Sequence, residues 1–143
     1  MQMTECINYL LSTVQRKVHK DMSCVLSPFD VTPAQYGVLS CIWQDGLDNP
    51  KAIADALKIE TASITNILER MENKGLILRR INKDDRRFVI VELTEKGLAL
   101  EEPILQTVEK FNLDTLALLT QEEQAVFKKA LGVLVNTAPV PAA

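Results

Sequence analysis

A short segment near the middle of the chain concentrates positive charge on an otherwise acidic protein. The 143 residues carry a formal net charge of −3, but residues 79–87 contain five basic side chains and only two acidic ones. The basic side chains are Arg79, Arg80, Lys83, Arg86 and Arg87. Guanidinium and ammonium groups bind phosphate through charge-assisted hydrogen bonds, so a focused basic patch can meet nucleic acid whatever the total charge.

One carboxylate in this segment is placed to orient an arginine. Asp85 lies two residues before Arg87 and can hold its guanidinium by a charge-assisted bond. Arg79 and Arg80 have a simpler alternative role, because natural sheets often place charge along an edge strand. We therefore predict that the DNA-contacting tip consists of Lys83, Asp85, Arg86 and Arg87.

The segment before this cluster has the pattern of an amphipathic helix with a polar face that can contact base edges. Its apolar positions follow the i, i+3, i+4, i+7 spacing: Ile64, Ile67, Leu68 and Met71. The other side of residues 61–74 offers groups that hydrogen-bond to bases and phosphates. These are Ser63, Asn66 and Arg70, with Thr61, Ala62 and Thr65 near the start. Arg70 has an alternative role in an ion pair with Glu69 or Glu72.

The neighbouring segments are typical of a helix-turn-helix followed by a hairpin. Thr32, Pro33 and Gln35 predict a helix start with a capping box, and Asn49 with Pro50 repeats the cap-then-proline signal. Residues 58–60 would form the turn, Thr61 would cap the next helix, and Gly75 would end it. The apolar period then changes from helical to alternating over residues 77–82 and 86–93, which predicts a β-hairpin.

Long helices are predicted near both ends of the chain. The first covers residues 4–27, a later one runs from Thr94 to about residue 119 with a kink or break at Pro103, and the last runs from Thr120 to about residue 135. Apolar residues that recur along these helices are Ile7, Leu10, Leu11, Val14, Leu105, Val108, Leu116, Val126, Leu131 and Leu134.

These elements together predict a mainly α fold with a small β-hairpin: a winged helix-turn-helix with long N- and C-terminal dimerisation helices. The expected organisation is one compact domain overall. Its parts are residues 1–30 (N-terminal dimerisation helix), 31–96 (DNA-binding region), 97–137 (C-terminal dimerisation helices) and 138–143 (flexible tail).

Composition and motifs argue against several other classes of protein. With 47% hydrophobic and 24% charged residues, no membrane-spanning apolar run and no signal-peptide pattern, we expect a cytoplasmic protein without a membrane partner. We find no glycine-rich phosphate loop, metalloprotease or hydrolase motif, or paired carboxylates, so we predict no enzyme, no catalytic residue and no cofactor. His19 is the single histidine, which argues against a metal site.

The three cysteines leave a redox alternative open. Cys6, Cys24 and Cys41 form neither a CxxC pair nor a disulfide framework, which fits a reducing compartment. We expect Cys41 to be buried, and Cys6 to lie in the first helix. A thiol-based redox-responsive regulator of the same fold is therefore one alternative. A winged-helix adaptor that binds protein is another, favoured by the acidic total charge.

The segments TPAQYGVL, PKAIADALKIETASITNILERMENKGLI and RRINKDDRRFVIVELTEKG resemble the MarR family of winged-helix transcription regulators. The family's Asp-x-Arg wing motif falls on Asp85 and Arg87. The resemblance covers about residues 5–136 and implies a homodimer that binds pseudo-palindromic double-stranded DNA, usually as a repressor. By the same resemblance, the ten apolar residues named above on the N- and C-terminal helices are predicted to be buried between the two copies. It also implies release by a small effector, often an aromatic or phenolic acid, in a pocket between the dimer helices and the DNA-binding region. By this analogy we expect the pocket near Tyr36 and Trp43.

Overall fold

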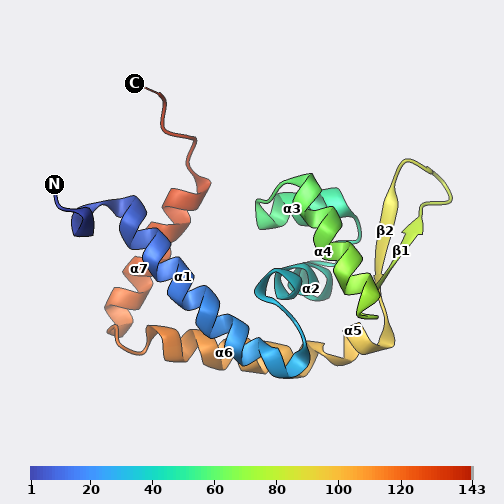
Figure 1. The fold of residues 1–143 in the computed structure, drawn as a ribbon, viewed down its shortest axis with the longest axis horizontal. Helices are drawn as coiled ribbons and strands as arrows, with labels where there is room; N and C mark the ends of the chain where they lie inside the picture. The colour runs from blue at the N-terminus through green and yellow to red at the C-terminus, as the bar shows by residue number, and fades with distance from the viewer. Residues whose placement is uncertain (143) are drawn as a thin grey trace. The chain divides into compact units, whose positions relative to one another are not determined.

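The computed structural model describes residues 1–142, and the chain forms two compact units that divide after Val108. Helix α6 runs from the first unit into the second (Figure 1). The first unit contains η1 (Met3–Glu5), α1 (Ile7–Leu26), η2 (Ser27–Phe29), α2 (Pro33–Asp45), α3 (Pro50–Leu57), α4 (Thr61–Asn73), β1 (Ile77–Ile81), β2 (Val89–Leu93), α5 (Glu95–Ala99) and the start of α6 (Glu101–Leu116). The second contains the end of α6 and α7 (Gln121–Asn136). The predicted fold class, mainly helical with one small hairpin, is confirmed.

Two of the predicted helix starts have the expected caps. At α2, the Gln35 N–H donates to Thr32 Oγ1 and the Thr32 N–H donates to Gln35 Oε1, each at 3.2 Å, which completes the capping box. At α3, the Ala52 N–H donates to Asn49 Oδ1 at 2.8 Å. Because these caps satisfy N–H groups that a helix leaves free, they define where α2 and α3 begin.

A single apolar core holds α2, α3, α4 and the hairpin together. Its most deeply buried side chains are Leu26, Val38, Leu39, Ile53, Ile64, Leu68, Met71, Leu76, Ile77, Val91 and Ile104. The α4 members of this set lie on one side of the helix, as the helical period predicts. The core therefore fixes which face of α4 is turned outward.

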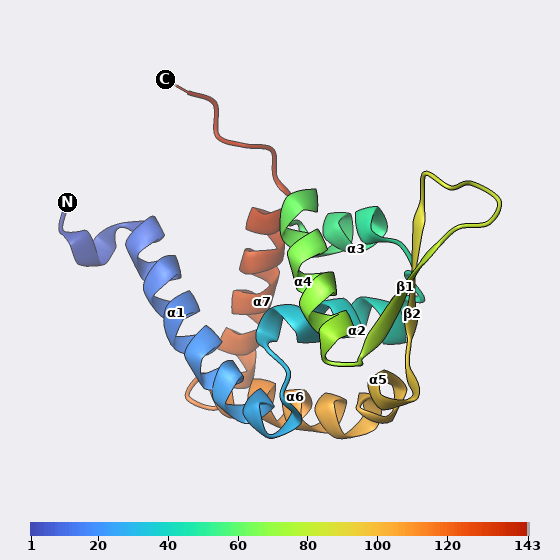
Figure 2. The same ribbon diagram turned by 45° about the vertical axis from the view of Figure 1, so that its right-hand side comes forward.

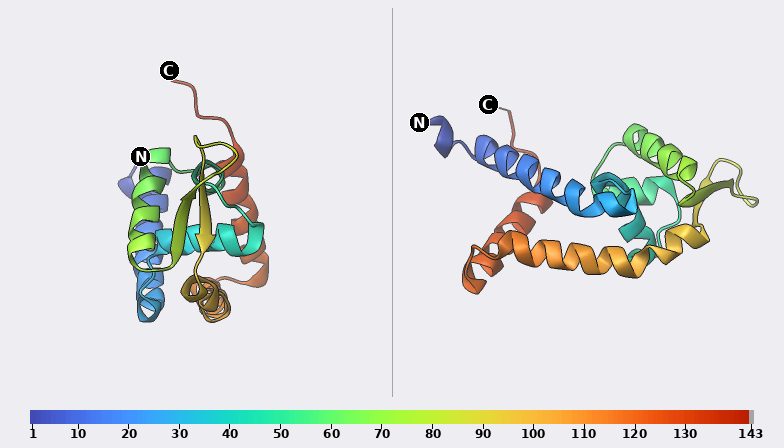
Figure 3. Two further views of the ribbon diagram at one scale, coloured as in Figure 1. Left: turned by 90° about the vertical axis from the view of Figure 1, so that its right-hand side faces the viewer. Right: turned by 60° about the horizontal axis from the view of Figure 1, so that its bottom comes forward.

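The hairpin is antiparallel and shorter than the sequence pattern predicts. Its register runs from Ile77 opposite Leu93 to Ile81 opposite Val89. Residues 82–88 form a loop rather than strand, because the side chain of Asn82 accepts hydrogen bonds from the backbone N–H groups of Asp84 and Asp85. In Figures 2 and 3 this loop extends away from the helices that pack beneath the hairpin.

Three helix boundaries differ from the prediction. Cys6 is the N-cap of α1, which begins at Ile7, so Cys6 lies before the first helix and not inside it. Glu60 is the N-cap of α4, so Thr61 is its first residue and not its cap. The helix predicted from Thr94 divides at Leu100, and Pro103 lies in the first turn of α6, where its missing N–H costs no helical hydrogen bond.

The second unit is a helical hairpin built on the end of α6. Thr120 caps α7 by accepting from the Glu123 N–H at 3.1 Å, and the Gln124 side chain donates to the carbonyl groups of Leu116 and Leu119. Residues 138–142 have no helix or strand. Over residues 1–142, every helix is too short or too polar to cross a membrane. The predicted division into dimerisation and DNA-binding parts stays a prediction.

Candidate DNA-binding surface

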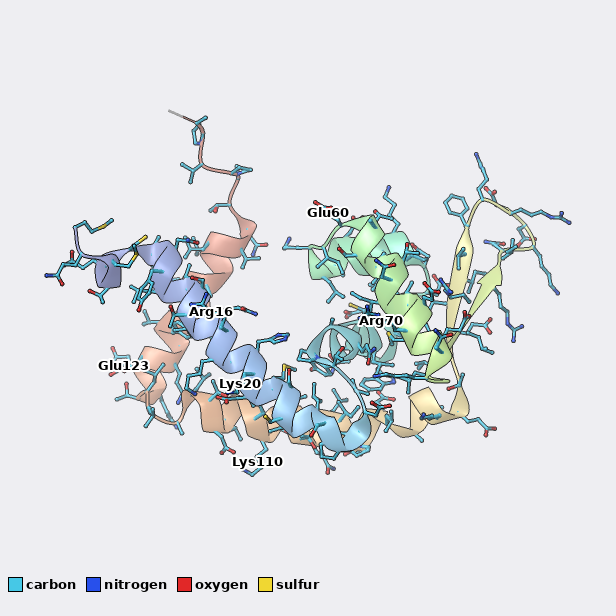
Figure 4. All side chains as sticks on the ribbon, in the orientation of Figure 1. Arg16, Lys20, Glu60, Arg70, Lys110 and Glu123 are labelled. Carbon is cyan, nitrogen blue, oxygen red and sulfur yellow. The ribbon has the colours of Figure 1, made fainter. Side chains whose placement is uncertain are left out.

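The polar face of α4 is exposed along the whole helix. Ile64, Leu68 and Met71 are buried on the inner face. The six residues predicted to contact DNA are all exposed: Thr61, Ala62, Ser63, Thr65, Asn66 and Arg70. Figure 4 labels Glu60 at the start of this helix and Arg70 nearer its end. The surface therefore has the chemistry that a DNA-reading helix needs, and contact with bases stays a prediction.

Arg70 does not pair with Glu72. That carboxylate accepts two hydrogen bonds from Arg79 instead, one from its backbone N–H at 2.9 Å and one from its guanidinium at 3.0 Å. Among the described residues, no ion pair joins Arg70 to Glu69 or to Glu72, so the alternative role predicted for Arg70 is wrong. The guanidinium of Arg70 lies on the exposed face of α4.

At the tip of the hairpin, Asp85 holds Arg87 as the sequence predicts. The carboxylate accepts from Nε of Arg87 at 3.0 Å, from a terminal guanidinium nitrogen at 2.7 Å and from its backbone N–H at 3.1 Å. The Arg87 guanidinium also lies 5.8 Å from the centre of the Phe88 ring. These bonds lower the pKa of the Asp85 carboxyl and raise that of Arg87. The Arg87 guanidinium is oriented, yet the side chain as a whole is 84% exposed and can meet a phosphate.

The other two basic residues of the tip lie together. Lys83 and Arg86 line one small surface hollow with Ile81 and Asn82. Both side chains are exposed. The loop therefore presents three cations, Lys83, Arg86 and Arg87, to its surroundings, and their contact with DNA stays a prediction.

The base of the hairpin carries a different kind of ion pair. The Arg79 side chain is 27% exposed and its partner Glu72 is 33% exposed. The hydrogen bonds from Arg79, the one from its side chain first, hold the pKa of the Glu72 carboxyl below its ordinary value. Arg80 instead pairs across the strands with Glu92, with Nε 3.0 Å from the carboxylate. The pairing of Glu72 with Arg79 could not be predicted from the sequence. Spacing rules describe pairs within one helix or within one hairpin, whereas Glu72 lies in a helix and Arg79 lies in a strand seven residues later.

The C-terminal end of α4 is also tied to the turn between α1 and α2. Nζ of Lys74 donates to the carbonyl oxygen of Asp30 at 2.8 Å and to Oε1 of Gln35 at 3.0 Å. Gln35 is only 3% exposed. Lys74 also borders a cavity of about 430 Å³ beside α1. The lining residues are His19, Ser23, Ser27, Asp30, Val31, Thr32, Pro33, Ala34 and Lys74.

The residues predicted to form an effector pocket lie elsewhere. Neither Tyr36 nor Trp43 lines the cavity beside α1. Both side chains are half-buried and pack against the core, and the Trp43 ring N–H donates to the carbonyl oxygen of Gly97 at 3.2 Å. Trp43 therefore stabilises the packing of α5 in the structure as it stands.

The outer helices expose most of the apolar residues that were predicted to pair two copies. On α1, Ile7, Leu10, Leu11 and Val14 are between 41% and 64% exposed, and on α7 Val126 and Leu134 are exposed as well. Leu105, Leu116 and Leu131 are half-buried. The prediction for Val108 is wrong. Its side chain is 6% exposed and belongs to the core of its own chain, so it cannot contact a second copy.

The cysteines differ in accessibility. Cys41 is buried, as predicted, and burial, with a smaller effect from Asp45, raises the pKa of its thiol. Cys24 is exposed and Cys6 is half-buried. Among the described residues, no group of three or more His, Cys, Asp and Glu side chains is arranged to hold a metal ion.

Comparison with known proteins identifies the family. The model of the MarR family matches residues 31–89, which span α2 to the start of β2. The multiple antibiotic resistance protein MarR of Escherichia coli is 31% identical over 123 residues, covering 85% of each chain. The chain belongs to the MarR family.

A second sequence relative and a solved structure of E. coli MarR extend this match. The organic hydroperoxide resistance transcriptional regulator of Bacillus subtilis is 30% identical over 102 residues, covering 71% of this chain and 69% of that protein. A cysteine-to-serine mutant of E. coli MarR, solved with operator DNA, superimposes with a TM-score of 0.84 at 29% identity, covering 94% of this chain and 98% of that one. The protein is thus a DNA-binding transcription regulator of the MarR family, and the prediction that it is not an enzyme is confirmed.

Proposed function

We propose that this MarR-family regulator acts in the cytoplasm as a homodimeric repressor that binds a pseudo-palindromic operator. Each copy places α4 in a major groove, with the two grooves about one helical turn, roughly 34 Å, apart. The observation that carries the proposal is the exposed polar face of α4 beside a hairpin whose tip arginine, Arg87, is already oriented by Asp85. In this arrangement Ser63 and Asn66 reach base edges, and Arg87 reaches the backbone or a narrow minor groove.

Dimerisation is supported by the apolar face of α1. Four aliphatic side chains, Ile7, Leu10, Leu11 and Val14, are exposed within two turns of the same helix. A monomer that left such a face in water would carry an exposed apolar patch, which soluble proteins seldom do. We therefore assign residues 1–30 and 97–137 to the dimer and residues 31–96 to DNA binding. Sedimentation velocity at micromolar concentration tests the dimer, and a single monomeric species would contradict it.

The experiment that tests operator binding is fluorescence anisotropy with the DNA upstream of the protein's own gene. A scrambled duplex of the same composition is the control, and salt is titrated for both. We expect tight binding that prefers the native sequence and weakens steeply with salt, because each phosphate contact releases counterions. Equal, weak binding to both duplexes would contradict an operator at this site. Binding without any salt dependence would favour the protein-binding adaptor.

We further propose that the effector is a small aromatic acid or phenol that binds in the cavity beside α1. Its volume of about 430 Å³ falls within the range of small-molecule sites. The Lys74 ammonium on its wall donates to the Asp30 carbonyl and to Gln35, and its ion pair with the Asp30 carboxylate is long, at 3.5 Å. In this proposal a carboxylate or phenolate of the effector replaces that ion pair, while Val31 and Pro33 supply apolar surface. Substituted benzoates and phenols added to the preformed protein–DNA complex test this. Loss of anisotropy with one of them supports the proposal, and a complex that survives all of them opposes it.

A further inference from the structure

One rung of the hairpin is hydrogen-bonded on both of its outer edges, in addition to the burial of Ile77 and Val91 in the core. Arg79 on β1 lies opposite Val91 on β2. Arg79 is bound by Glu72 of α4 through its backbone N–H and its guanidinium. The Val91 N–H donates to the carbonyl oxygen of Asp48, in the loop between α2 and α3, at 2.6 Å. Both strands are therefore anchored at the same level, and Glu72 supplies the anchor that comes from α4.

Toward the tip from this rung, Arg80 and Ile81 are exposed, so the rung is the hydrogen-bonded contact of β1 with α4 that lies nearest the tip. Strand residues rise by about 3.3 Å, so Asn82, where the loop begins, lies roughly 10 Å beyond Arg79. A tilt of about 15° at the rung moves that point by roughly 2.5 Å, which is more than the distance range of a hydrogen bond allows. Small changes at the rung therefore decide whether the basic tip and α4 reach the same duplex together.

The chemistry of Glu72 suits an anchor and not a DNA contact. A free carboxylate beside the phosphate backbone would repel it, but this one is neutralised by Arg79 and accepts two hydrogen bonds. A bond to a backbone N–H positions the strand itself, which a bond to a flexible side chain alone would not do. The Arg80–Glu92 pair lies entirely within the hairpin and leaves its angle to α4 unchanged.

We propose that Glu72 is a positioning residue for DNA recognition, whose carboxylate sets the angle between α4 and the hairpin so that both contact the operator at once. The inference rests on the proposed operator binding. Glu72 does not touch DNA in this proposal, and its effect reaches DNA only through the placement of Arg87 and its neighbours.

A double-mutant cycle between Glu72 and Arg87 tests the proposal. The measured quantity is the affinity for the native duplex with and without R87A in each background. The general electrostatic gain from removing the Glu72 carboxylate is present in both members of a comparison and therefore cancels. We expect R87A to lower the affinity roughly tenfold in the wild-type background but less than about threefold in E72A, because the tip is already misplaced there. E92A is the matched control, since it removes an arginine–carboxylate pair of the same hairpin, and in it R87A should keep its full effect.

Two results would overturn the proposal: an R87A effect of equal size in the wild-type, E72A and E92A backgrounds, or an E72A protein with wild-type affinity and specificity. If E72A does not give a cooperative melting transition, E72M replaces it under the same criteria, because methionine keeps the length of the side chain and removes both acceptor oxygens. A wild-type protein that fails to distinguish the two duplexes would refute operator binding itself, before any Glu72 variant is compared.

Discussion

The tip and the base of the hairpin each hold an arginine–carboxylate pair, and the two pairs do different work. At the tip, Asp85 and Arg87 are two residues apart in one loop, and the arginine is 84% exposed. At the base, Glu72 and Arg79 are seven residues apart in a helix and a strand, and the arginine is 27% exposed. The first pair orients one side chain, whereas the second holds one element against another. The Asp85–Arg87 pair therefore orients the arginine proposed to contact DNA, and the Glu72–Arg79 pair is proposed to set the position of the hairpin that carries it.

The base of the hairpin packs against the rest of the protein, whereas the tip is held only by bonds within its own loop. Beneath the base, Ile77 and Val91 are buried in the core, and Thr94 Oγ1 donates to the carbonyl oxygen of Gly75 at 2.6 Å. In the tip loop, the hydrogen bonds of Asn82 and Asp85 remain within residues 82–88. We therefore expect changes at the base to alter folding stability, and changes at the tip to alter DNA binding alone.

The largest expected effect is that of G97A, beneath the base. A Cβ at Gly97 would lie 2.2 Å from the carbonyl oxygen of Leu76, so backbone must move to admit it. We expect a loss of about 1–3 kcal/mol in the free energy of unfolding, measured by urea titration. G132A is the matched control, because nothing lies within 4 Å of its added Cβ and alanine favours a helix, here by about 0.5–1 kcal/mol. A G97A protein as stable as the wild type would show that the base is not tightly packed.

The next effect is that of R87A, at the tip. We expect operator affinity to fall roughly tenfold and the slope of log affinity against log salt to decrease by about 1, since one phosphate contact is lost. The thermal midpoint should stay at the wild-type value because the guanidinium is exposed. An unchanged salt slope together with unchanged affinity would refute the assignment of Arg87 to the DNA contact.

A smaller effect is expected for D85A. The guanidinium of Arg87 remains, but without its carboxylate it samples more rotamers and must be ordered on binding. We expect a loss of affinity of about threefold, with the salt slope kept, because the number of phosphate contacts does not change. Anisotropy titrations at several salt concentrations measure both quantities. If D85A weakened binding as much as R87A, Asp85 would have a role beyond orienting its neighbour.

The smallest effect is a pH dependence of stability that originates at the base. Since the pKa of Glu72 is lowered in the folded protein from its ordinary value of 4.5, its ionised form stabilises the fold above that pH. This contribution is lost as the pH falls through the lowered pKa. Thermal midpoints of the wild type should therefore decrease on acidification more than those of E72Q. Parallel curves for the two proteins would mean that the pair adds no stability.

The helix starts, the exposed face of α4 and the orientation of Arg87 could be predicted from the sequence, because they depend on residues that are close together along the chain. The capping box of Thr32 and Gln35 spans three residues, and the bond of Asp85 to Arg87 spans two. The helical period of α4 decides which side chains face outward once its apolar stripe is buried. The same patterns, taken together, also indicated the MarR family and its fold.

The tertiary structure alone decided the interactions between distant segments. Glu72 meets Arg79, and Lys74 meets Gln35, only because the chain reverses at Gly75 and α4 packs beside the turn before α2. Val108 is buried in its own chain, although its spacing on α6 is equally compatible with a surface between copies. Helical and strand periods state which face of an element is apolar, but not which surface will cover that face. That choice depends on how all the elements pack at once, so it belongs to the fold and not to any one segment.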